Sequence, residues 1–169
     1  DYNPAGKLTM SFPRNVGQIP IYYSVRNTGR PNGGDVFGKY RSNYLDVENS
    51  PLLPFGYGLS YTTFSYGKPV LSAPTLTAAK AITASVTLAN TGNYDGEEVV
   101  QLYIKDDAAS ITRPLKELKD FKKVFLKKGE KKNIEFTLSE NAFAFWDEVS
   151  KDWKVEPGEF EILIGKSSE

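Results

Sequence analysis

Hydrophobic and polar residues alternate along the second half of the chain, from about residue 67 onward. In residues 82–88 the apolar side chains occupy every second position, with Thr and Ser between them. A two-residue period is typical of strands that bury one face and expose the other. The same pattern recurs at 132–138, at 159–165 and at the apolar residues Val100, Leu102 and Ile104. The second half is therefore predicted to form an antiparallel sheet structure.

Turn-forming residues separate the predicted strands. Gly, Asn, Asp and Pro gather at residues 90–96, 128–130 and 156–158, where they favour tight reversals of the backbone. About seven short strands at this spacing, within about 100 residues, fit an immunoglobulin or fibronectin type III sandwich. The sequence has no Cys, and the lack of a Cys pair favours the fibronectin-like variant.

Residues 114–128 allow two interpretations. Four apolar residues there have near-helical spacing, and Pro114 is suited to the first turn of a helix. Phe121, Lys123 and Phe125 fit the alternation of a strand equally well. The β-rich neighbourhood favours a strand at about 119–126.

The first half of the chain has a different character, because it is rich in Gly, Pro, Asn and Tyr. Turn signals occupy residues 28–35 and 50–58, and short extended pieces are predicted at 8–12 and 19–23. A loop-rich stretch of this length rarely folds by itself. We interpret it as the last part of a preceding domain, followed by a linker on that domain's surface.

Composition excludes several classes of function. The charges balance, with 21 Lys and Arg against 21 Asp and Glu, so binding to nucleic acid or to a membrane surface is not expected. The sequence contains no Cys and no His, which excludes thiol catalysis, histidine-dependent triads, zinc sites and haem ligation. No apolar run approaches the roughly 20 residues that cross a bilayer. We expect no cofactor and no metal ion.

Several ordered motifs point to a known family. The first half carries NPAGKL at 3–8, SFPR at 11–14, GQIP at 17–20 and PLLPFGYGLSYTTF at 51–64. The second half carries NTG at 90–92, GEEVVQLY at 96–103 and RPLKEL at 113–118, followed by FKKV, GE and EPG. In this order the motifs resemble the C-terminal region of the family 3 glycoside hydrolases, the β-glucosidase and β-xylosidase group. The resemblance covers essentially the whole chain.

This resemblance implies a barrel domain, an α/β sandwich domain and a β-sandwich in one polypeptide. The family's nucleophile is an Asp of the barrel domain, and its acid/base is usually a Glu of the α/β domain. Both belong upstream of the segment that begins at Asn3, so the chain is expected to carry no catalytic residue. Its expected role is that of a non-catalytic accessory domain of a retaining β-glycosidase that hydrolyses terminal β-D-glycosides, with β-glucosides favoured.

The resemblance also implies a division of the chain. Residues 1–66 are expected to be the tail of the α/β domain with a linker, and residues 67–169 the fibronectin type III-like sandwich. The fold class is then all-β, with a loop-rich segment from a truncated α/β domain in front. The expected partners are the upstream catalytic domains of the same polypeptide, and oligosaccharide substrate only through the parent enzyme. We expect a periplasmic or secreted location, and a homodimer is left open.

Three acidic pairs are candidates for catalysis, because a retaining glycosidase needs two carboxyl groups about 5–5.5 Å apart. The pairs are Glu97 with Glu98, Asp106 with Asp107, and Asp147 with Glu148. The first pair opens a strand, where neighbouring side chains point to opposite faces. The other two pairs sit at strand ends, where acidic residues are usually solvated. None of the three is expected to be catalytic.

Two further groups of side chains suggest binding sites. Asn93, Asp95, Asp106 and Asp107 carry oxygens that suit calcium, although turn formation explains them better because no loop has the ligand spacing. Trp146 and Trp153 flank a short acidic stretch, and a hairpin turn there would place the two rings opposite each other. They then form a sugar-stacking platform or, as we favour, a packed aromatic pair or an interface with the missing domain.

Tyrosines crowd the first half, at Tyr22, Tyr23, Tyr40, Tyr44, Tyr57 and Tyr61. They are expected to pack on the α/β domain, and contact with substrate is the alternative. Gly56 and Gly58 bracket Tyr57 and suggest a tight backbone path, so we interpret residues 55–61 as a structural lock between domains. If this half lies on a missing domain, it should expose apolar surface. The second hypothesis for the chain is an independent carbohydrate-binding or adhesion module.

Overall fold

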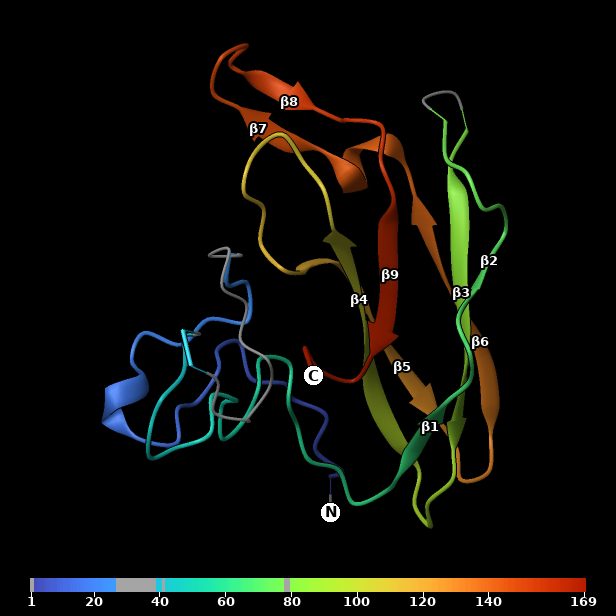
Figure 1. Ribbon diagram of the computed structural model, residues 1–169. Coiled ribbons are helices and arrows are strands. Elements are labelled where there is room, and N and C mark those ends of the chain that lie inside the picture. Colours follow the sequence, from blue (N-terminus) through green and yellow to red (C-terminus); the bar gives the residue numbers. More distant parts are fainter. Residues whose placement is uncertain (1, 27–38, 41, 78–79) are drawn as a thin grey trace.

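The computed structural model describes residues 2–26, 39–40, 42–77 and 80–169 (Figure 1). Within this part of the chain, the strands form two packed sheets and a separate hairpin. Two short 3-10 helices, η1 (Val16–Gln18) and η2 (Glu140–Phe143), complete the described elements. The all-β sandwich expected from the alternation of residues is confirmed. No helix in the described part of the chain has the length and apolarity to cross a bilayer.

The first sheet is built around β3 (Ile82–Asn90). β6 (Lys131–Leu138) pairs with one edge of β3 over the whole length of β6. Two short strands, β1 (Phe64–Tyr66) and β2 (Val70–Leu71), share the other edge of β3. All of these pairings are antiparallel.

The second sheet has the order β5-β4-β9, so β4 (Gly96–Asp106) lies in the middle. β5 (Glu117–Leu126) and β9 (Phe160–Gly165) pair with its two edges, again antiparallel. β7 (Phe145–Asp147) and β8 (Asp152–Lys154) form a hairpin that projects at one end of the sandwich (Figure 1).

The hydrophobic core lies between the two sheets. The four inward residues of β3, from Ile82 to Leu88, are each at most 6% exposed, and the inward apolar residues of β4 at most 2%. Phe136 of β6 is fully buried between them. Burial contributes about 25 cal/mol for each Å² of apolar surface removed from water. The alternation in the sequence therefore decides which face of each strand lies inside.

The structure settles the two interpretations of residues 114–128 in favour of a strand. β5 pairs with β4 in register, with Phe121 opposite Gln101 and Phe125 opposite Glu97. The apolar spacing that looked helical arises because both phenylalanines lie on the outer face, where they are 61% and 47% exposed. Only Leu126 at the end of the strand is fully buried.

The extended pieces expected at 8–12 and 19–23 do not form strands. Leu8 donates its amide to the carbonyl of Tyr57, and Phe12 forms an isolated bridge with Leu53. Longer ladders are prevented because Pro13 and Pro20 have no amide hydrogen to donate. The turn expected at 28–35 lies outside the described residues.

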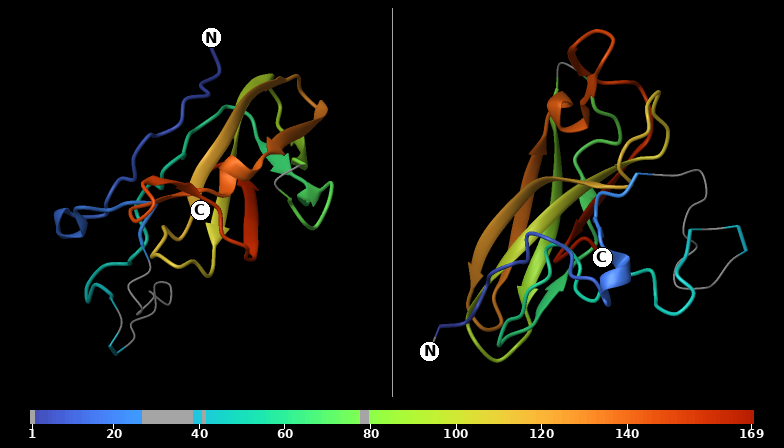
Figure 2. Two further views of the ribbon diagram at one scale, coloured as in Figure 1. Left: turned by 90° about the horizontal axis from the view of Figure 1, so that it is seen from above. Right: turned by 90° about the vertical axis from the view of Figure 1, so that its left-hand side faces the viewer.

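The described part of the first half runs outside the sandwich and lies beside the sheet that contains β4. Figures 1 and 2 show this segment along one side of the molecule, away from β3 and β6. It reaches the sandwich proper at β1, which pairs with the end of β3. The contact between this segment and the sheet that contains β4 lies outside the hydrophobic core.

Candidate functional site

The outer face of β4 carries two side chains that the first half of the chain covers. Gln101 and Tyr103 point away from the core, and yet they are only 3% and 2% exposed. Tyr23 stacks on Phe55 with ring centroids 4.2 Å apart, and its edge meets the Tyr103 ring at 6.0 Å. Burial raises the pKa of the Tyr103 hydroxyl above its ordinary value. The first half of the chain therefore covers the outer face of β4, which would otherwise be exposed to solvent.

Gly56 makes the closest approach in this contact. The amide of Gln101 donates to the carbonyls of Gly56 at 3.1 Å and Lys166 at 2.8 Å, and its oxygen accepts the Tyr103 hydroxyl at 2.6 Å. Gly56 has φ +78, and a Cβ there would stand 2.0 Å from the Gln101 Oε1 atom. The tight path expected around Tyr57 is therefore present, because only glycine fits this position.

Asn3 fastens the start of the chain to the turn between β3 and β4. Its side-chain oxygen accepts hydrogen bonds from the Ser60 hydroxyl at 3.0 Å and the Tyr61 amide at 2.9 Å. Its side-chain nitrogen donates to the Asp95 carbonyl at 2.9 Å. One side chain thus joins the first residues, the segment before β1 and the sandwich.

Asn90 holds the same turn from inside. It is 1% exposed, and its oxygen accepts the Thr62 hydroxyl at 2.7 Å. Its nitrogen donates to the carbonyls of Tyr94 at 2.8 Å and Leu126 at 3.2 Å. A buried polar side chain with all of these bonds fixes one arrangement of its neighbours, so the linker before β1 has a defined position on the sandwich.

A buried ion pair adds a third tie between the two halves. The Lys7 ammonium lies 2.9 Å from the Glu98 carboxylate, and the two side chains are 14% and 7% exposed. The Tyr66 hydroxyl donates to the same carboxylate oxygen at 3.0 Å. Burial, and then the negative charge of Glu98, raise the pKa of Tyr66 above its ordinary value. Glu98 of β4 is therefore held by two residues of the first half of the chain, Lys7 and Tyr66.

We expect Tyr66→Phe to lower the free energy of unfolding by about 1.5 kcal/mol, the contribution of a hydrogen bond to a charged group. The reason is that Glu98 keeps Lys7 but loses its second donor. Urea denaturation of both proteins measures the change. Tyr94→Phe is the matched control, because Tyr94 is 63% exposed and should change stability little. Equal effects of the two substitutions would contradict the role given to Tyr66.

The first half of the chain carries many exposed apolar side chains. Val16 is 83% exposed and Leu45 87%. Other members of this surface, each at least 42% exposed, are Tyr2, Met10, Phe12, Ile19, Tyr22, Val25, Tyr40, Leu52, Leu59 and Tyr61. We call this set, together with Val16 and Leu45, the apolar surface of the first half. Exposed apolar side chains in this number suit a contact with another protein surface.

The first acidic pair does not converge. Glu97 accepts a hydrogen bond from the Tyr2 hydroxyl at 2.8 Å and forms an ion pair with Lys123 at 2.7 Å. These contacts, with Lys123 the larger, lower the pKa of Glu97. Glu98 has different partners, described above, so each carboxylate of this pair has a structural contact of its own.

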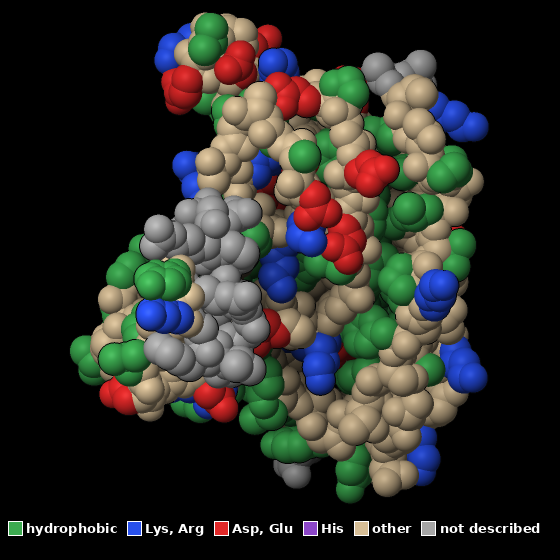
Figure 3. Space-filling view, in the orientation of Figure 1, with side chains coloured by type: hydrophobic (Ala, Val, Ile, Leu, Met, Phe, Trp, Pro, Cys, Tyr) green, Lys and Arg blue, Asp and Glu red, His purple; other side chains and the backbone are tan. Residues whose placement is uncertain are grey.

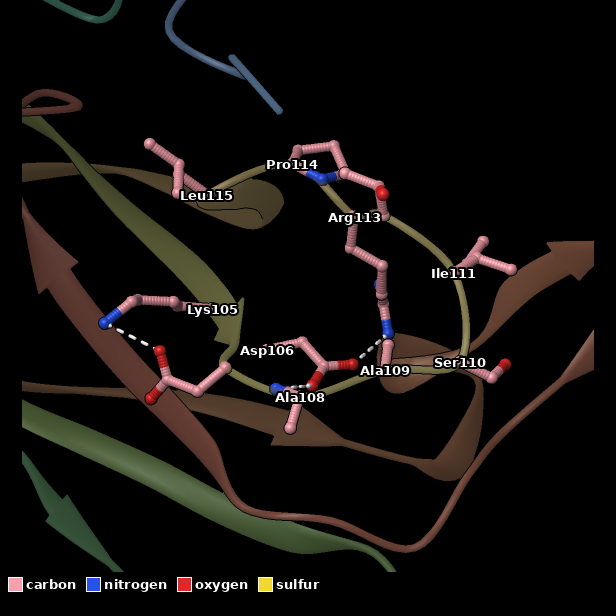
Figure 4. Close-up of a pocket in the computed structure, with 11 residues that line it drawn as sticks. Lys105, Asp106, Ala108, Ala109, Ser110, Ile111, Arg113, Pro114 and Leu115 are labelled. Atoms are coloured by element: carbon pink, nitrogen blue, oxygen red, sulfur yellow. Dashed lines mark hydrogen bonds and ion pairs between the residues drawn. The ribbon is translucent and has the colours of Figure 1, made fainter. Parts of the chain in front are cut away.

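The second pair frames a loop of residues 105–115 (Figure 4). The Asp106 carboxylate binds the Arg113 guanidinium at 2.9 Å, and the Ala108 amide donates to its other oxygen. Arg113 also binds Glu117 at 2.8 Å and donates to the Phe143 carbonyl at 2.9 Å. Arg113 and Asp106 are 4% and 6% exposed at the side chain, so this ion pair shapes the loop from inside.

The neighbouring Asp107 is bound elsewhere. It pairs with Lys105 at 2.9 Å, and the same ammonium reaches Glu161 of β9 at 3.2 Å. The loop of residues 105–115 encloses a polar hollow of about 360 Å³. Figure 4 shows that the Asp106 carboxylate points at the Arg113 guanidinium across the start of the loop. The carboxylates of this pair are both engaged by cations.

The third pair belongs to the turn between β7 and β8. Asp147 accepts hydrogen bonds from the hydroxyl and amide of Ser150 and from the Val149 amide. These bonds, the Ser150 hydroxyl first, lower the pKa of Asp147. Glu148 forms an exposed ion pair with Lys151 at 2.6 Å. The pair closes the turn, which is the ordinary role of an Asp in this position.

The stretch between the two tryptophans is a hairpin turn, and Trp146 and Trp153 are direct cross-strand partners. Their rings are 5.9 Å apart and meet edge to face at 77°. They are 42% and 66% exposed. An edge-to-face pair stabilises a two-stranded hairpin, but the two rings do not form one flat platform for a sugar.

The calcium candidates lie at opposite ends of one strand. Asn93 and Asp95 precede β4, whereas Asp106 and Asp107 follow it or end it. Eleven residues of strand separate the two groups by about 35 Å, at about 3.3 Å per residue. One ion cannot bind both groups. In the described part of the chain, no three acidic side chains are placed to hold a metal ion.

One exposed carboxylate contact makes the stability sensitive to pH. Glu156 accepts hydrogen bonds from the Ser110 hydroxyl at 2.7 Å and amide at 2.9 Å, and it pairs with Lys154 at 3.0 Å. The bonds from Ser110 contribute most to lowering the pKa of Glu156 from 4.5 to about 2. A lowered pKa in the folded state stabilises the fold above the unfolded pKa, and the benefit is lost as pH falls toward the folded pKa.

We therefore expect Glu156→Gln to be less stable than the natural chain above pH 4.5 and to approach it as pH falls to about 2. Urea denaturation of both proteins across this range measures the difference. Glu159→Gln is the matched control, because Glu159 is exposed and forms no ion pair within the described residues. A stability difference for Glu156→Gln that is constant with pH would contradict the assignment.

Comparisons with known proteins agree with this architecture. Residues 98–168 match the model of the fibronectin type III-like domain. A periplasmic β-glucosidase of Salmonella typhimurium is 51% identical over 99% of this chain and 22% of its own length. A β-xylosidase of Formosa agariphila is 47% identical over the same shares of the two chains. The crystal structure of a β-glucosidase from Listeria innocua in complex with gluconolactone superposes with a TM-score of 0.91 at 43% identity, covering 99% of this chain and 23% of that one. The chain thus spans about a fifth of the length of these relatives.

Proposed function

We propose that this chain is a non-catalytic part of a β-glycosidase. It corresponds to the C-terminal region of the family 3 glycoside hydrolases, and it carries a fibronectin type III-like domain in residues 98–168. Its role is to buttress the catalytic domains of the same polypeptide. The parent enzyme hydrolyses terminal β-D-glycosides, with β-glucosides favoured by the names of the relatives. A periplasmic or secreted location follows the relative that is named periplasmic.

The observation that carries this proposal is that the first half is fastened to the sandwich and yet exposes many apolar side chains. Gly56, Asn3 and Lys7 fasten it through short polar contacts. The apolar surface defined above belongs to the same segment, with Leu45 87% exposed. A segment that is fixed to one domain and still exposes apolar side chains is suited to join two domains rigidly.

We further propose that the boundary between domains lies near residue 66, with 1–66 belonging to the neighbouring α/β domain and 67–169 to the sandwich. The contacts of Tyr23 and Gly56 with β4 support an interface across this boundary. β1 (Phe64–Tyr66) pairs with β3, so the last residues of the first part also complete the edge of the first sheet. The linker therefore enters the sandwich as a strand.

Replacing the matching 168 residues of the Salmonella enzyme with this chain tests the proposal. The chimera should hydrolyse an aryl β-glucoside, because the catalytic domains would find the same support. The same enzyme without these residues should lose activity. A chimera that folds, is soluble and yet is as inactive as the shortened enzyme would contradict the supporting role.

Two substitutions locate the contact within the chimera. Val16→Asp and Leu45→Asp should leave the isolated chain unchanged, since both side chains are exposed there. In the chimera each should lower the melting temperature, because a charge would be buried without a partner at the domain contact. Val149→Asp is the matched control, because Val149 is 92% exposed on the β7–β8 turn and should be neutral in both proteins.

An independent carbohydrate-binding module is the second candidate, and only the exposure of Trp146 and Trp153 favours it. Titration of the chain with cello-, xylo- and laminari-oligosaccharides, followed by tryptophan fluorescence, separates the two hypotheses. The supporting role predicts no saturable change. Saturable binding that Trp153→Ala abolishes would favour the binding module.

A further inference from the structure

Strand β5, at one edge of the second sheet, has aromatic side chains on its outer face. Phe121 pairs with Gln101, and Phe125 pairs with Glu97, in the register between β5 and β4. Cross-strand partners lie on the same face of a sheet, and Gln101 points away from the core, so both phenylalanines also point outward. They are 61% and 47% exposed. β5 therefore presents two phenylalanine rings to the outside of the sandwich.

The inward face of the same strand carries a charged residue between them. Lys122 pairs with Val100, which is fully buried. The Lys122 ammonium lies 5.4 Å from the centre of the Phe136 ring and donates a hydrogen bond to the Glu135 carbonyl, so it covers the core between β5 and β6. At these positions β5 has its apolar side chains outside and a charge inside, the reverse of a half-buried strand. Reversals of this kind are expected where a surface has a function.

An ion pair lies between the two rings. Lys123 pairs with Val99 in the same register, so it shares the outer face, and its ammonium lies 2.7 Å from the Glu97 carboxylate. Residues four apart on a strand are separated by about 13 Å, which is the spacing of the two rings along β5. We call Phe121, Lys123 and Phe125, together with Val99 and Glu97, the β5 face. Its charges are paired with each other, and its remaining side chains are apolar.

The start of the chain lies beside the β5 face. The Tyr2 hydroxyl donates to the Glu97 carboxylate at 2.8 Å, and the Asn3 side chain donates to the Asp95 carbonyl at 2.9 Å. The right-hand view of Figure 2 shows the start of the chain passing in front of this sheet. Tyr2 is 74% exposed and belongs to the apolar surface of the first half, and Figure 3 shows hydrophobic side chains of that half on the left of the view. The two surfaces therefore adjoin where Tyr2 meets Glu97.

We propose that the β5 face packs directly against the α/β domain that precedes residue 1 in the longer polypeptide. The inference rests on the proposed function, in which residues 1–66 belong to that domain. It adds a contact made by the sandwich itself to the contacts made by the first half. Aromatic side chains are enriched in protein interfaces, and the pairing of Lys123 with Glu97 avoids the cost of burying an unpaired charge.

A domain of the same polypeptide fits this face better than other occupants. Small ligands bind in concave pockets, whereas the two rings stand on the open face of a sheet. The contact of Tyr2 with Glu97 holds the polypeptide that precedes residue 1 beside the β5 face. A tethered partner has an effective concentration in the millimolar range, which a second copy of the chain reaches only in very concentrated solution. The chain spans 22% of the length of its Salmonella relative, so the longer polypeptide has room for such a domain.

Single thiols test this contact, because the chain has no Cys of its own. Phe121→Cys and Phe125→Cys each place one thiol on the β5 face. Val70→Cys is the matched control, because Val70 is 60% exposed, close to the 61% of Phe121, but lies on β2 in the other sheet. Each substitution is made in the isolated chain and in the chimera with the Salmonella enzyme. The rate of alkylation by iodoacetamide is measured by mass spectrometry of the peptide that carries the substitution.

In the isolated chain the three thiols should react at similar rates, because all three positions are exposed. In the chimera the thiols at positions 121 and 125 should react about ten-fold more slowly or less, since the domain contact must open before they react. The thiol at position 70 should keep its rate. Equal rates at the three positions in the chimera, or equal slowing of all three, would overturn the proposal.

Two further outcomes separate this inference from its alternatives. Slow reaction at positions 121 and 125 in the isolated chain, together with a dimer by light scattering, would overturn the proposal because a second copy would then be the occupant. An active chimera whose thiols on the β5 face react freely would refute this contact and leave the supporting role intact. An inactive chimera with protected thiols would contradict the supporting role and support the contact.

Discussion

Gly56→Ala is expected to lower the free energy of unfolding by about 3 kcal/mol, from overpacking together with a strained left-handed backbone. The new methyl group would stand 2.0 Å from the Gln101 Oε1 atom at a residue with φ +78. Gln101 is a flexible side chain, but it cannot move aside without losing its bonds to Gly56, Lys166 and Tyr103. The substitution should therefore loosen the first half from the sheet. Urea denaturation and hydrogen exchange of the residues 55–57 measure both effects.

Gly129→Ala is the matched control for this prediction. Gly129 has φ +76, nearly the same backbone conformation, but a Cβ there meets no atom within 4 Å. It should cost about 1 kcal/mol, the penalty of the left-handed conformation alone. The excess for Gly56→Ala measures the contact with Gln101. Similar losses for the two substitutions would contradict the close contact between Gly56 and β4.

Arg113→Met is expected to destabilise the chain by about 3 kcal/mol, because removing one member of a buried ion pair leaves the other charge without compensation. The Asp106 carboxylate is 6% exposed and would lose its cation, and the Phe143 carbonyl would lose a donor. The loop of residues 105–115 should become mobile, since Arg113 is its internal anchor. Thermal denaturation and hydrogen exchange of this loop test the expectation.

Lys105→Met provides the comparison for Arg113. Lys105 also binds two carboxylates, those of Asp107 and Glu161, but its side chain is 35% exposed. Ion pairs at the surface contribute at most about 1 kcal/mol, so the loss should be much smaller than for Arg113→Met. A larger effect at Lys105 would mean that burial does not decide the strength of these contacts.

The strands were predictable because the alternation of apolar and polar residues that specifies each strand lies within its own few residues. In β3 and β6, apolar side chains recur at every second residue, and each lies in the core as expected. The pairing of Trp146 with Trp153 was predictable for the same reason, since a short acidic turn joins two short strands. The choice between helix and strand at 114–128 needed the neighbouring strands as well as the local pattern.

The contacts of the first half were not predictable from the alternation. Gln101 and Tyr103 occupy outward positions of β4, which the pattern assigns to solvent. They are buried because Tyr23 and Gly56, which lie far earlier in the sequence, contact Tyr103 and Gln101. The signal that was present is the pair of glycines around Tyr57, which indicated a close backbone approach without naming its partner. Long-range contacts of this kind depend on how distant segments of the chain meet in space, and the local pattern of apolar residues carries no information about this.

Arg113 was missed as a structural residue for a related reason. A charged side chain in a loop is usually solvated, and the resemblance identified RPLKEL without a role for its first residue. Its burial arises because Asp106, Glu117 and the Phe143 carbonyl converge on it from three elements. That Glu97 and Glu98 do not converge was easier to predict, because neighbouring side chains on a strand point to opposite faces.

Hydrolysis of an aryl β-glucoside by the purified 169-residue chain tests most directly whether the chain supports a β-glycosidase or performs its chemistry. The account predicts no release of the aryl group above the rate in buffer, over hours and at high protein concentration. The chimera described above serves as the positive control under the same conditions. Turnover by the isolated chain that is lost on substitution of any of its acidic pairs would contradict the account.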